Sequence, residues 1–314
     1  MGGHEAPRLI MDFSIIIATF DRPDALDRLL RGIANHFDKS PFRFEVVIAN
    51  NARDETVAQA IDEVVDRYAT AMPACFRRIR ETLPGKCRAQ NCAIAAAKGD
   101  LLVFFDDDVD VTPHWLEITA KFFRDKPDYH VMQGAILMPP EYRQDKEFLR
   151  AHARYRTINF VQYPAHMSEI YTLTGANMAM RREVFDRAGL FNEALGPGCS
   201  GISEDVEFAQ RVIRSGMRIG YEPAAGVIHE VDRSRLSEQF FRQRHEQQGR
   251  SRLIYKKQSM ASIIPNLLRS IGTLGWYLLT GNERKLYRAK GRYFHYRAMA
   301  IEKLKRRKTQ VPAL

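Results

Sequence analysis

Residues 101–110 read Leu-Leu-Val-Phe-Phe-Asp-Asp-Asp-Val-Asp, an apolar run that ends abruptly in three aspartates. A run this short, without polar residues at alternate positions, is typical of a strand buried on both faces. Strands of that kind belong to parallel sheets, because helices cover both faces of such sheets. The stretch therefore predicts a central strand whose carboxyl end carries a cluster of carboxylates.

The sequence before this stretch repeats the pattern of a short apolar strand followed by a helix. We expect strands at residues 13–18, 44–49 and 76–79, and helices that begin at Pro23 and cover residues 57–68 and 89–97. Such alternation predicts an α/β fold with a mostly parallel sheet flanked by helices. Ligands of these sheets bind at the carboxyl ends of the strands. Residues 19–21 and 50–51 should therefore lie on the same rim as residues 106–108.

Beyond residue 110 the pattern is less regular. We expect a helix at residues 115–123, a strand at 131–137, a segment of variable pattern up to 165, a strand at 170–173, a helix at 203–215, strands at 218–221 and 226–231, and helices from 235 onward. Residues 233–308 hold 20 lysines and arginines against four acidic residues, a net charge of +16, whereas the rest of the chain has a net charge of −6. Such asymmetry indicates an anionic partner: a membrane surface, a nucleic acid or a phosphorylated substrate.

The aspartate triplet has a chemical interpretation. Adjacent carboxylates at a strand end repel one another, so we expect a cation beside them. Hard oxygen ligands suit Mn²⁺ or Mg²⁺, which also bind substrate phosphates and neutralise a leaving diphosphate. A solvated acidic turn is the alternative, and the position directly after a buried strand favours the metal site.

Four segments carry a resemblance to a known family. They are residues 14–23 (Ser-Ile-Ile-Ile-Ala-Thr-Phe-Asp-Arg-Pro), residues 91–100 leading into Phe105-Asp-Asp-Asp108, residues 175–182 (Gly-Ala-Asn-Met-Ala-Met-Arg-Arg) and Ser203-Glu-Asp205. In this order and spacing the sequence resembles the family 2 glycosyltransferases of the GT-A fold, and is similar to those of bacterial exopolysaccharide and lipopolysaccharide synthesis. The resemblance implies an inverting, metal-dependent enzyme. It would move a sugar from a nucleoside diphosphate sugar, here a UDP-sugar, to a hydroxyl of a lipid-linked or polysaccharide acceptor.

The resemblance also implies a role for each matching position. The nucleotide sugar would contact Thr19, Asp21, Asn50, Asn51, Asn91, Asp106, Asp107, Asn177 and Arg250. Asp108 would hold the metal. His229 follows an apolar strand, where many relatives carry a histidine that completes the metal site or contacts the diphosphate. A structural histidine is the equal alternative.

Asp205 matches the catalytic base of inverting members, and Glu204 an acceptor-orienting residue. Inverting transfer needs one carboxylate that takes the proton of the acceptor hydroxyl. The alternative is that both acids favour a helix amino terminus that Ser203 caps. Arg250 ends a Gln-x-x-Arg element like that of polymerising relatives, but Ser251 replaces their tryptophan. A single sugar addition is therefore expected.

Two positions depart from the family pattern. Ala49 stands where the second strand ordinarily ends in a base-binding aspartate, and Asn50 and Asn51 follow it. The Arg-Asn pair before the metal strand reads Gln90-Asn91, with basic residues displaced nearby. An asparagine can bond to a base through its carbonyl and its amide.

The chain is expected to have two parts. A GT-A catalytic domain would cover residues 1–232, with a nucleotide-binding half at about 12–110 and an acceptor half at about 111–232. A basic helical region would cover residues 233–314. Its mixture of basic, apolar and aromatic residues suits an anionic membrane surface.

The location follows from what the sequence lacks. No apolar stretch approaches the length of about 18–20 residues of a spanning helix, and no signal pattern precedes the first strand. We therefore expect a cytoplasmic protein, peripheral on the inner face of the cell membrane, without a nucleic-acid partner.

Two other functions would each explain part of the sequence. A nucleic-acid-binding protein would explain the basic region, but not an aspartate triplet at a strand end. A sugar nucleotidyltransferase would need a glycine-rich loop after the first strand, and residues 18–23 contain no glycine.

Overall fold

In a computed structural model of the protein, the apolar run after residue 100 forms strand β4 (Leu101–Asp106), whose first five side chains are buried. It pairs in parallel with β1 (Asp12–Thr19), which pairs in parallel with β2 (Arg43–Asn50). A further parallel strand, β3 (Phe76–Arg80), lies beside β2. The strands expected in the amino-terminal part of the chain are thereby confirmed.

Helices connect these parallel strands. They are α1 (Pro23–Phe37), α2 (Glu55–Ala71) and α3 (Lys86–Ala96). Helix α1 begins at Pro23, as expected. Helices α2 and α3 begin at Glu55 and Lys86, slightly before their expected starts at residues 57 and 89. Asp54 explains the start of α2, because its side chain accepts a hydrogen bond from the backbone NH of Val57, which has no partner inside the helix. The helix expected at residues 115–123 is α4 (Trp115–Asp125).

On the other side of β4 the sheet is mixed. Its strands are β5 (Val109–Val111), β6 (Tyr129–Leu137), β7 (Glu169–Ile170), β8 (Asn177–Arg181) and β9 (Arg218–His229), and a short helix α6 (Glu183–Ala188) follows β8. The strand order is β3-β2-β1-β4-β8-β6-β9-β5, with β7 also on β9. The expected break between strands at residues 218–221 and 226–231 was wrong, because β9 runs without interruption from Arg218 to His229.

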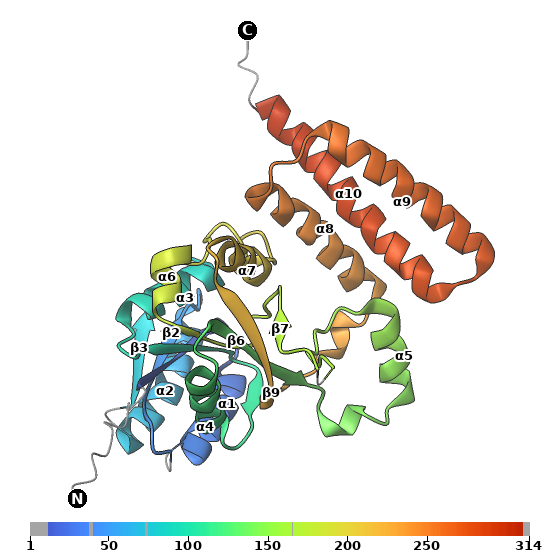
Figure 1. Cartoon of the computed structure of the whole chain (residues 1–314). Helices are drawn as coiled ribbons and strands as arrows, with labels where there is room; N and C mark the ends of the chain where they lie inside the picture. The colour runs from blue at the N-terminus through green and yellow to red at the C-terminus, as the bar shows by residue number, and fades with distance from the viewer. Residues whose placement is uncertain (1–11, 38–39, 73–74, 165, 310–314) are drawn as a thin grey trace, which may run out of the picture. The chain divides into compact units, whose positions relative to one another are not determined.

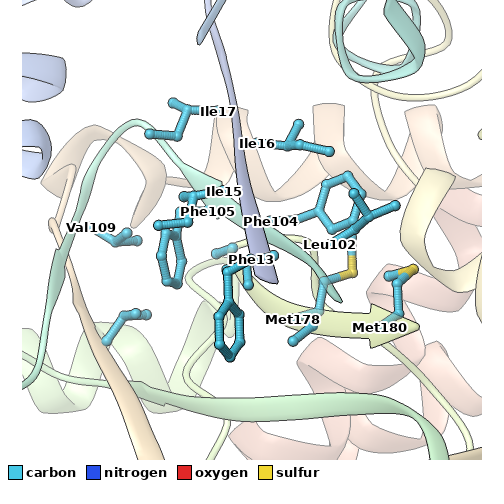
Figure 2. Close-up of a cluster of buried hydrophobic side chains, with 14 of the residues drawn as sticks. Phe13, Ile15, Ile16, Ile17, Leu102, Phe104, Phe105, Val109, Met178 and Met180 are labelled. Carbon is cyan, nitrogen blue, oxygen red and sulfur yellow. The ribbon is translucent and has the colours of Figure 1, made fainter. Parts of the chain in front are cut away.

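The main core lies between the sheet and its helices. Figure 2 shows side chains of β1, β4 and β8 that meet there. Leu102 lies opposite Met180 and Phe104 lies opposite Met178 across the antiparallel β4–β8 pair. Ile16 and its neighbours on β1 are completely buried. Burial of apolar surface stabilises the folded chain by about 25 cal/mol for each Å² removed from water. This packing therefore holds the strands in place, and with them the residues that follow the strand ends.

The structure describes residues 12–37, 40–72, 75–164 and 166–309 (Figure 1). The first residues of the expected catalytic domain, 1–11, and the last residues of the expected basic region, 310–314, lie outside the described residues. The chain divides into two units. Unit 1 holds the residues up to Leu137, Phe160–Phe191 and Phe208–Glu230. Unit 2 holds Met138–Asn159, Asn192–Glu207 and the residues from Val231 onward. The sheet belongs to unit 1.

Unit 2 is helical. Its elements are the short helices η1 (Pro140–Tyr142) and η2 (Arg233–Arg235), with α5 (Lys146–Tyr155), α8 (Glu238–Tyr255), α9 (Met260–Thr280) and α10 (Glu283–Thr309). A further helix, α7 (Glu204–Arg214), begins in unit 2. Gly281 has a φ of +68° and turns the chain between α9 and α10, which run antiparallel side by side (Figure 1). Among the described residues, no helix has the length and apolar character needed to cross a membrane.

Candidate active site

The rim at the carboxyl ends of β1, β2 and β4 gathers polar side chains, as expected. Thr19 lies opposite Asn50 in the β1–β2 register, and Ala18 lies opposite Asp106 in the β1–β4 register. The Thr19 hydroxyl donates a hydrogen bond of 2.8 Å to Oδ2 of Asp107. Asp21, two residues further along, is exposed to solvent. The predicted convergence of these strand ends is confirmed.

Arg22 links two of the aspartates. Its Nη2 lies 2.5 Å from Oδ1 of Asp107, and its Nη1 lies 2.5 Å from Oδ2 of Asp108. Burial would lower the pKa of Arg22, but the charges of Asp107 and Asp108 raise it above its ordinary value. Burial raises the pKa of Asp107 to about 6, although Arg22 opposes this shift. The guanidinium therefore compensates carboxylate charge at the rim.

Lys86, at the start of α3, forms an ion pair with Asp106. Burial opposes the ionisation of Asp106, but the Lys86 ammonium holds the pKa of Asp106 below its usual value. The Cα of Gly175 lies close to the same ammonium, because a methyl group added there would lie 3.4 Å from Nζ. Lys86 thus lies between the aspartate cluster and the turn that precedes β8.

A group that suits a metal ion lies at this rim. It consists of Asp106, Asp108 and His229, whose ligand atoms all lie within 4.8 Å of one another. The register explains the meeting, because His229 lies opposite Val109 in the antiparallel β5–β9 pair. The backbone NH of Glu230 also donates a 2.9 Å hydrogen bond to the carbonyl of Asp108.

The chemistry of this group fits a divalent cation. Oδ1 of Asp108 is buried and has no hydrogen-bond partner among the residues that the structure describes, an arrangement that costs free energy unless a cation or donor is present. Nδ1 of His229 lies 2.6 Å from the Glu230 carbonyl oxygen. A carbonyl oxygen only accepts, so Nδ1 donates to it, and the other ring nitrogen, Nε2, faces Oδ1 of Asp108 at 3.6 Å.

Asn50 and Asn51 use their side chains within unit 1. The amide of Asn50 donates to the Ala58 carbonyl and to Asp62, and its oxygen accepts from Ala52 and Arg80. Asn51 binds the loop that leads into α3. Its amide donates to the carbonyls of residues 81 and 83, and its oxygen accepts from the backbone NH of residue 85. Both side chains thereby hold the loops around the rim.

Asn91 and Asn177 are also bound to neighbouring groups. Asn91 exchanges two hydrogen bonds of 3.0 Å with the backbone of Phe191. Asn177 is fully buried at the start of β8 and donates to the carbonyls of Ala135 and Ala225, both at 2.8 Å. Its oxygen accepts a 3.2 Å hydrogen bond from the indole of Trp115. The Asn177 amide thus connects three elements of unit 1.

The remaining expected site residues belong to unit 2. Glu204 and Asp205 are the first residues of α7, after Ser203, which has a φ of +82°. Oδ1 of Asp205 accepts from the next backbone NH, that of Val206, at 2.7 Å. Burial lowers the pKa of Arg244 on α8, and the Asp205 charge opposes that shift.

The Gln-x-x-Arg element on α8, Gln247 to Arg250, contacts other residues of unit 2. Arg250 lies 4.0 Å from Glu246, one turn away. A methyl group added to Gly201 would lie 2.7 Å from Gln247, so the loop before α7 packs directly against that side chain. The functional roles predicted for the residues of unit 2 stay predictions.

Two charged residues of the rim were missed as site residues. Arg22 lies within the segment 14–23 and Lys86 lies shortly before Gln90-Asn91, but their aspartate partners are on a different strand end. The available signal was position, because each is a basic residue close to the amino terminus of a helix that follows a strand of the parallel half of the sheet.

Comparisons with known proteins agree with this geometry. The model of the family described as "Glycosyl transferase family 2" matches residues 14–189. A pre-mycofactocin glycosyltransferase of Mycobacterium tuberculosis is 28% identical over 149 residues, which are 46% of this chain and 30% of that protein. The O-antigen biosynthesis protein RfbC of Myxococcus xanthus is 25% identical over 241 residues, 72% of this chain and 18% of that protein. The matches therefore span less than a third of either relative.

A solved structure shares the fold. The mannosyltransferase PcManGT from Pyrobaculum calidifontis, in complex with GDP-Man and Mn²⁺, superposes with a TM-score of 0.60 at 18% identity, covering 93% of this chain and 86% of that one. At that identity the likeness establishes the GT-A-like architecture only. The expected fold class is confirmed.

Proposed function

The chain belongs to glycosyl transferase family 2 and is a transferase enzyme, and on that premise we propose that it moves one sugar from a nucleoside diphosphate sugar, a UDP-sugar, to an acceptor hydroxyl. The acceptor would be a lipid-linked or polysaccharide intermediate, and the anomeric configuration would invert. Family membership favours glycosyl transfer over sugar nucleotidyl transfer. The observation that carries the proposal is the group of Asp106, Asp108 and His229 at the sheet rim.

A divalent cation, Mn²⁺ or Mg²⁺, would be held by those three side chains, and when bound it supplies positive charge that stabilises a leaving diphosphate. Oδ1 of Asp108 is buried and has no hydrogen-bond partner in the part of the chain that the structure describes, which supports this assignment, as does Nε2 of His229, which lies 3.6 Å from it. Arg22 and Lys86 bring two further cations to the rim. In our proposal they balance the carboxylates and attract the anionic donor.

Thr19, Asp21 and Asp107 would contact the donor at the same rim. The geometry supports a different contribution from Asn50, Asn51, Asn91 and Asn177, whose amides are engaged with neighbouring groups. We propose that these asparagines hold the loops and strands on which the donor rests. Arg250 would contact the diphosphate from α8.

Asp205 would act as the general base. Its carboxylate would take the proton of the acceptor hydroxyl while that oxygen attacks the anomeric carbon. Glu204 would orient the acceptor. The assignment rests on the position of the Ser-Glu-Asp motif after the aspartate motif in the sequence, and both acids lie at the first turn of α7.

We also propose attachment to an anionic membrane surface at the cytoplasmic face. One stripe of α9 supports it, because Ile264, Leu268, Ile271 and Leu278 recur at helical spacing and are all more than a third exposed. A stripe of exposed isoleucines and leucines beside the basic residues of α10 suits the membrane interface between lipid headgroups and acyl chains.

Thermal unfolding tests the donor site. The full chain is heated with a panel of nucleoside diphosphates and nucleotide sugars, with and without Mn²⁺ or Mg²⁺. A ligand that binds only the folded state raises the melting temperature by mass action. We expect a metal-dependent rise with UDP and its sugars that Asp108→Ala abolishes and Asp205→Asn retains, since the base acts on the acceptor. A rise that Asp108→Ala leaves unchanged would contradict the proposal.

A further inference from the structure

A cavity of about 350 Å³ lies entirely within unit 2, between the carboxyl end of α5 and the helices α8 and α10. Ligand pockets in proteins occupy about 300–1,000 Å³. Six arginines line it: Arg154, Arg156, Arg252, Arg284, Arg288 and Arg292. Among the described residues, no aspartate or glutamate lines it. The cavity is therefore strongly positive and large enough for a group bigger than a single small ion.

Five of these arginines form no ion pair with any residue in the described part of the chain. The exception is Arg154, whose Nη2 lies 2.7 Å from Oε1 of Glu283. Acidic residues elsewhere on the same helices are already engaged, because Glu238 pairs with Lys290 and Glu246 pairs with Arg297. Clustered guanidiniums repel one another, so this arrangement calls for an anion from outside the unit.

Aromatic rings give the cavity firm walls. Tyr287 packs edge-on against Tyr155 and Phe241, with ring centroids 5.4 Å apart in each pair. The Tyr287 hydroxyl donates to Glu238 at 3.1 Å, which holds the ring in place. The guanidinium of Arg154 lies 5.9 Å from the centroids of both Tyr155 and Tyr287. Arg154 thus lies against a cluster of packed rings.

Two histidines sit where α8 and α10 approach most closely. A methyl group on Gly291 would lie 2.6 Å from Nε2 of His245, and one on Gly249 would lie 2.3 Å from the carbonyl of His295. Glycine at both positions lets the helices meet, and both histidines line the cavity. Burial, with the nearby arginine charges, lowers the pKa of each histidine to about 4. Near pH 7 both rings are neutral and offer one donor and one acceptor.

We propose that this cavity binds a phosphorylated ligand that carries at least two negative charges, such as a diphosphate group. Guanidinium forks match phosphate oxygens through paired, charge-assisted hydrogen bonds. Five unpaired arginines exceed what one monophosphate engages, and the volume accommodates the larger group. None of the lining residues has a role in the proposed sugar transfer, so this binding site does not depend on that function.

Titration calorimetry with inorganic pyrophosphate tests the site. The full chain is titrated in EDTA, without donor, acceptor or metal, so that a failure of the metal-dependent transferase site cannot alter the result. Arg288 and Arg292 are exposed, unpaired and on the cavity wall. We expect the double variant Arg288→Gln, Arg292→Gln to bind pyrophosphate at least about tenfold more weakly, and inorganic phosphate to bind more weakly than pyrophosphate.

The control variant removes the same charge outside the cavity. Arg269→Gln with Lys303→Gln also lowers the net charge by two, and neither residue lines the cavity. This control should bind pyrophosphate like the unmodified chain. Equal losses in the two double variants, or no pyrophosphate binding by the unmodified chain, would overturn the proposal. Circular dichroism shows that each variant is folded.

A vesicle experiment identifies the source of the phosphate. Neutral phosphatidylcholine vesicles are compared with vesicles that also contain a polyprenyl diphosphate. If the lipid diphosphate increases binding of the unmodified chain but not of the Arg288→Gln, Arg292→Gln variant, the headgroup is the ligand. If it increases neither while pyrophosphate still binds, the ligand is soluble. An equal increase in both proteins would count against the cavity.

Discussion

Nε2 of His229 lies 3.6 Å from Oδ1 of Asp108, a buried carboxylate oxygen that has no hydrogen-bond partner within the described ranges of the chain. One residue comes from the loop after β4 and the other from the end of β9. The β5–β9 pairing holds both, so the spacing depends on the sheet and not on a flexible loop. A metal site on paired strands retains its geometry better than one on loops.

This relationship predicts the effect of His229→Ala. Removal of one ligand should weaken Mn²⁺ binding at least about tenfold and reduce transfer, while the fold is retained. Manganese titration followed by electron paramagnetic resonance measures the affinity. His130→Ala serves as the control, because His130 lies on β6 beside Arg187 and outside the metal group. Unchanged Mn²⁺ affinity in His229→Ala would remove the histidine from the site.

Asn177→Ala should destabilise the protein by about 3 kcal/mol or more. The substitution leaves the Trp115 indole NH and the carbonyls of Ala135 and Ala225 buried without partners, at about 1–3 kcal/mol each. Urea denaturation measures the free energy of unfolding. Asn35→Ala on the exposed face of α1 is the control and should change it little. Lost activity at full stability would instead assign Asn177 to the substrate.

Gly291→Ala should lower the free energy of unfolding of unit 2 by about 1–3 kcal/mol, because the new methyl group would meet the imidazole of His245. Gly272→Ala is a matched control. It also replaces a glycine inside a helix, but nothing lies within 4 Å of the added methyl group. That variant should be more stable by about 0.5–1 kcal/mol. Calorimetric melting of both variants separates steric conflict from helix propensity.

The two cavity histidines predict a dependence of stability on pH. Their pKa values fall from the usual 6.5 to about 4 in the folded chain, so the unfolded chain binds more protons between these values. Stability should therefore decrease as the pH falls through this window, by up to about 1.4 kcal/mol per pH unit for each histidine. The variant His245→Gln, His295→Gln should show a smaller slope in urea denaturation series between pH 6.5 and pH 4. Identical slopes would contradict the assignment.

The exposed stripe of α9 predicts binding to vesicles. Leu268 and Leu278 are 62% and 63% exposed, and replacement of both by serine should weaken co-sedimentation with anionic vesicles about tenfold. Leu83, 55% exposed in unit 1, provides the control. Leu83→Ser should leave vesicle binding unchanged. If the α9 variant binds like the unmodified chain, the membrane-facing assignment of this helix is wrong.

Much of the parallel half of the sheet could be predicted from the sequence. Its strands are apolar and β-branched, its helices have one apolar stripe, and both signals are local. Strand β8 was not expected, because Asn177-Met-Ala-Met-Arg181 contains no β-branched residue. It is a strand because it fills the space between β4 and β6, a property of its neighbours. Likewise β9 continues across Pro223 because two strands pair with parts of it that the sequence pattern had separated.

The location of the candidate site could be predicted from the sequence, but the partners of several of its side chains could not. Clustering of the strand ends follows from topology, so the aspartates and Thr19 could be placed together. The partners of Arg22 and Lys86 depend on side-chain reach across the rim, and sequence periodicity does not report that. The hydrogen bonds of the Asn50 and Asn177 side-chain amides could not be predicted either, because the sequence of a motif does not show whether its asparagine binds a substrate or the backbone.

The origin of His229 on β9 has a consequence for folding. The aspartates enter the chain early, but their imidazole partner arrives on the last strand of the described sequence, and the two meet only after β5 has paired with β9. Contacts between residues so distant in the sequence close slowly, because the intervening loop must first be ordered. During synthesis, a chain that has not yet emerged beyond β8 holds the acidic cluster without its third ligand. Tight metal capture would then coincide with completion of the sheet.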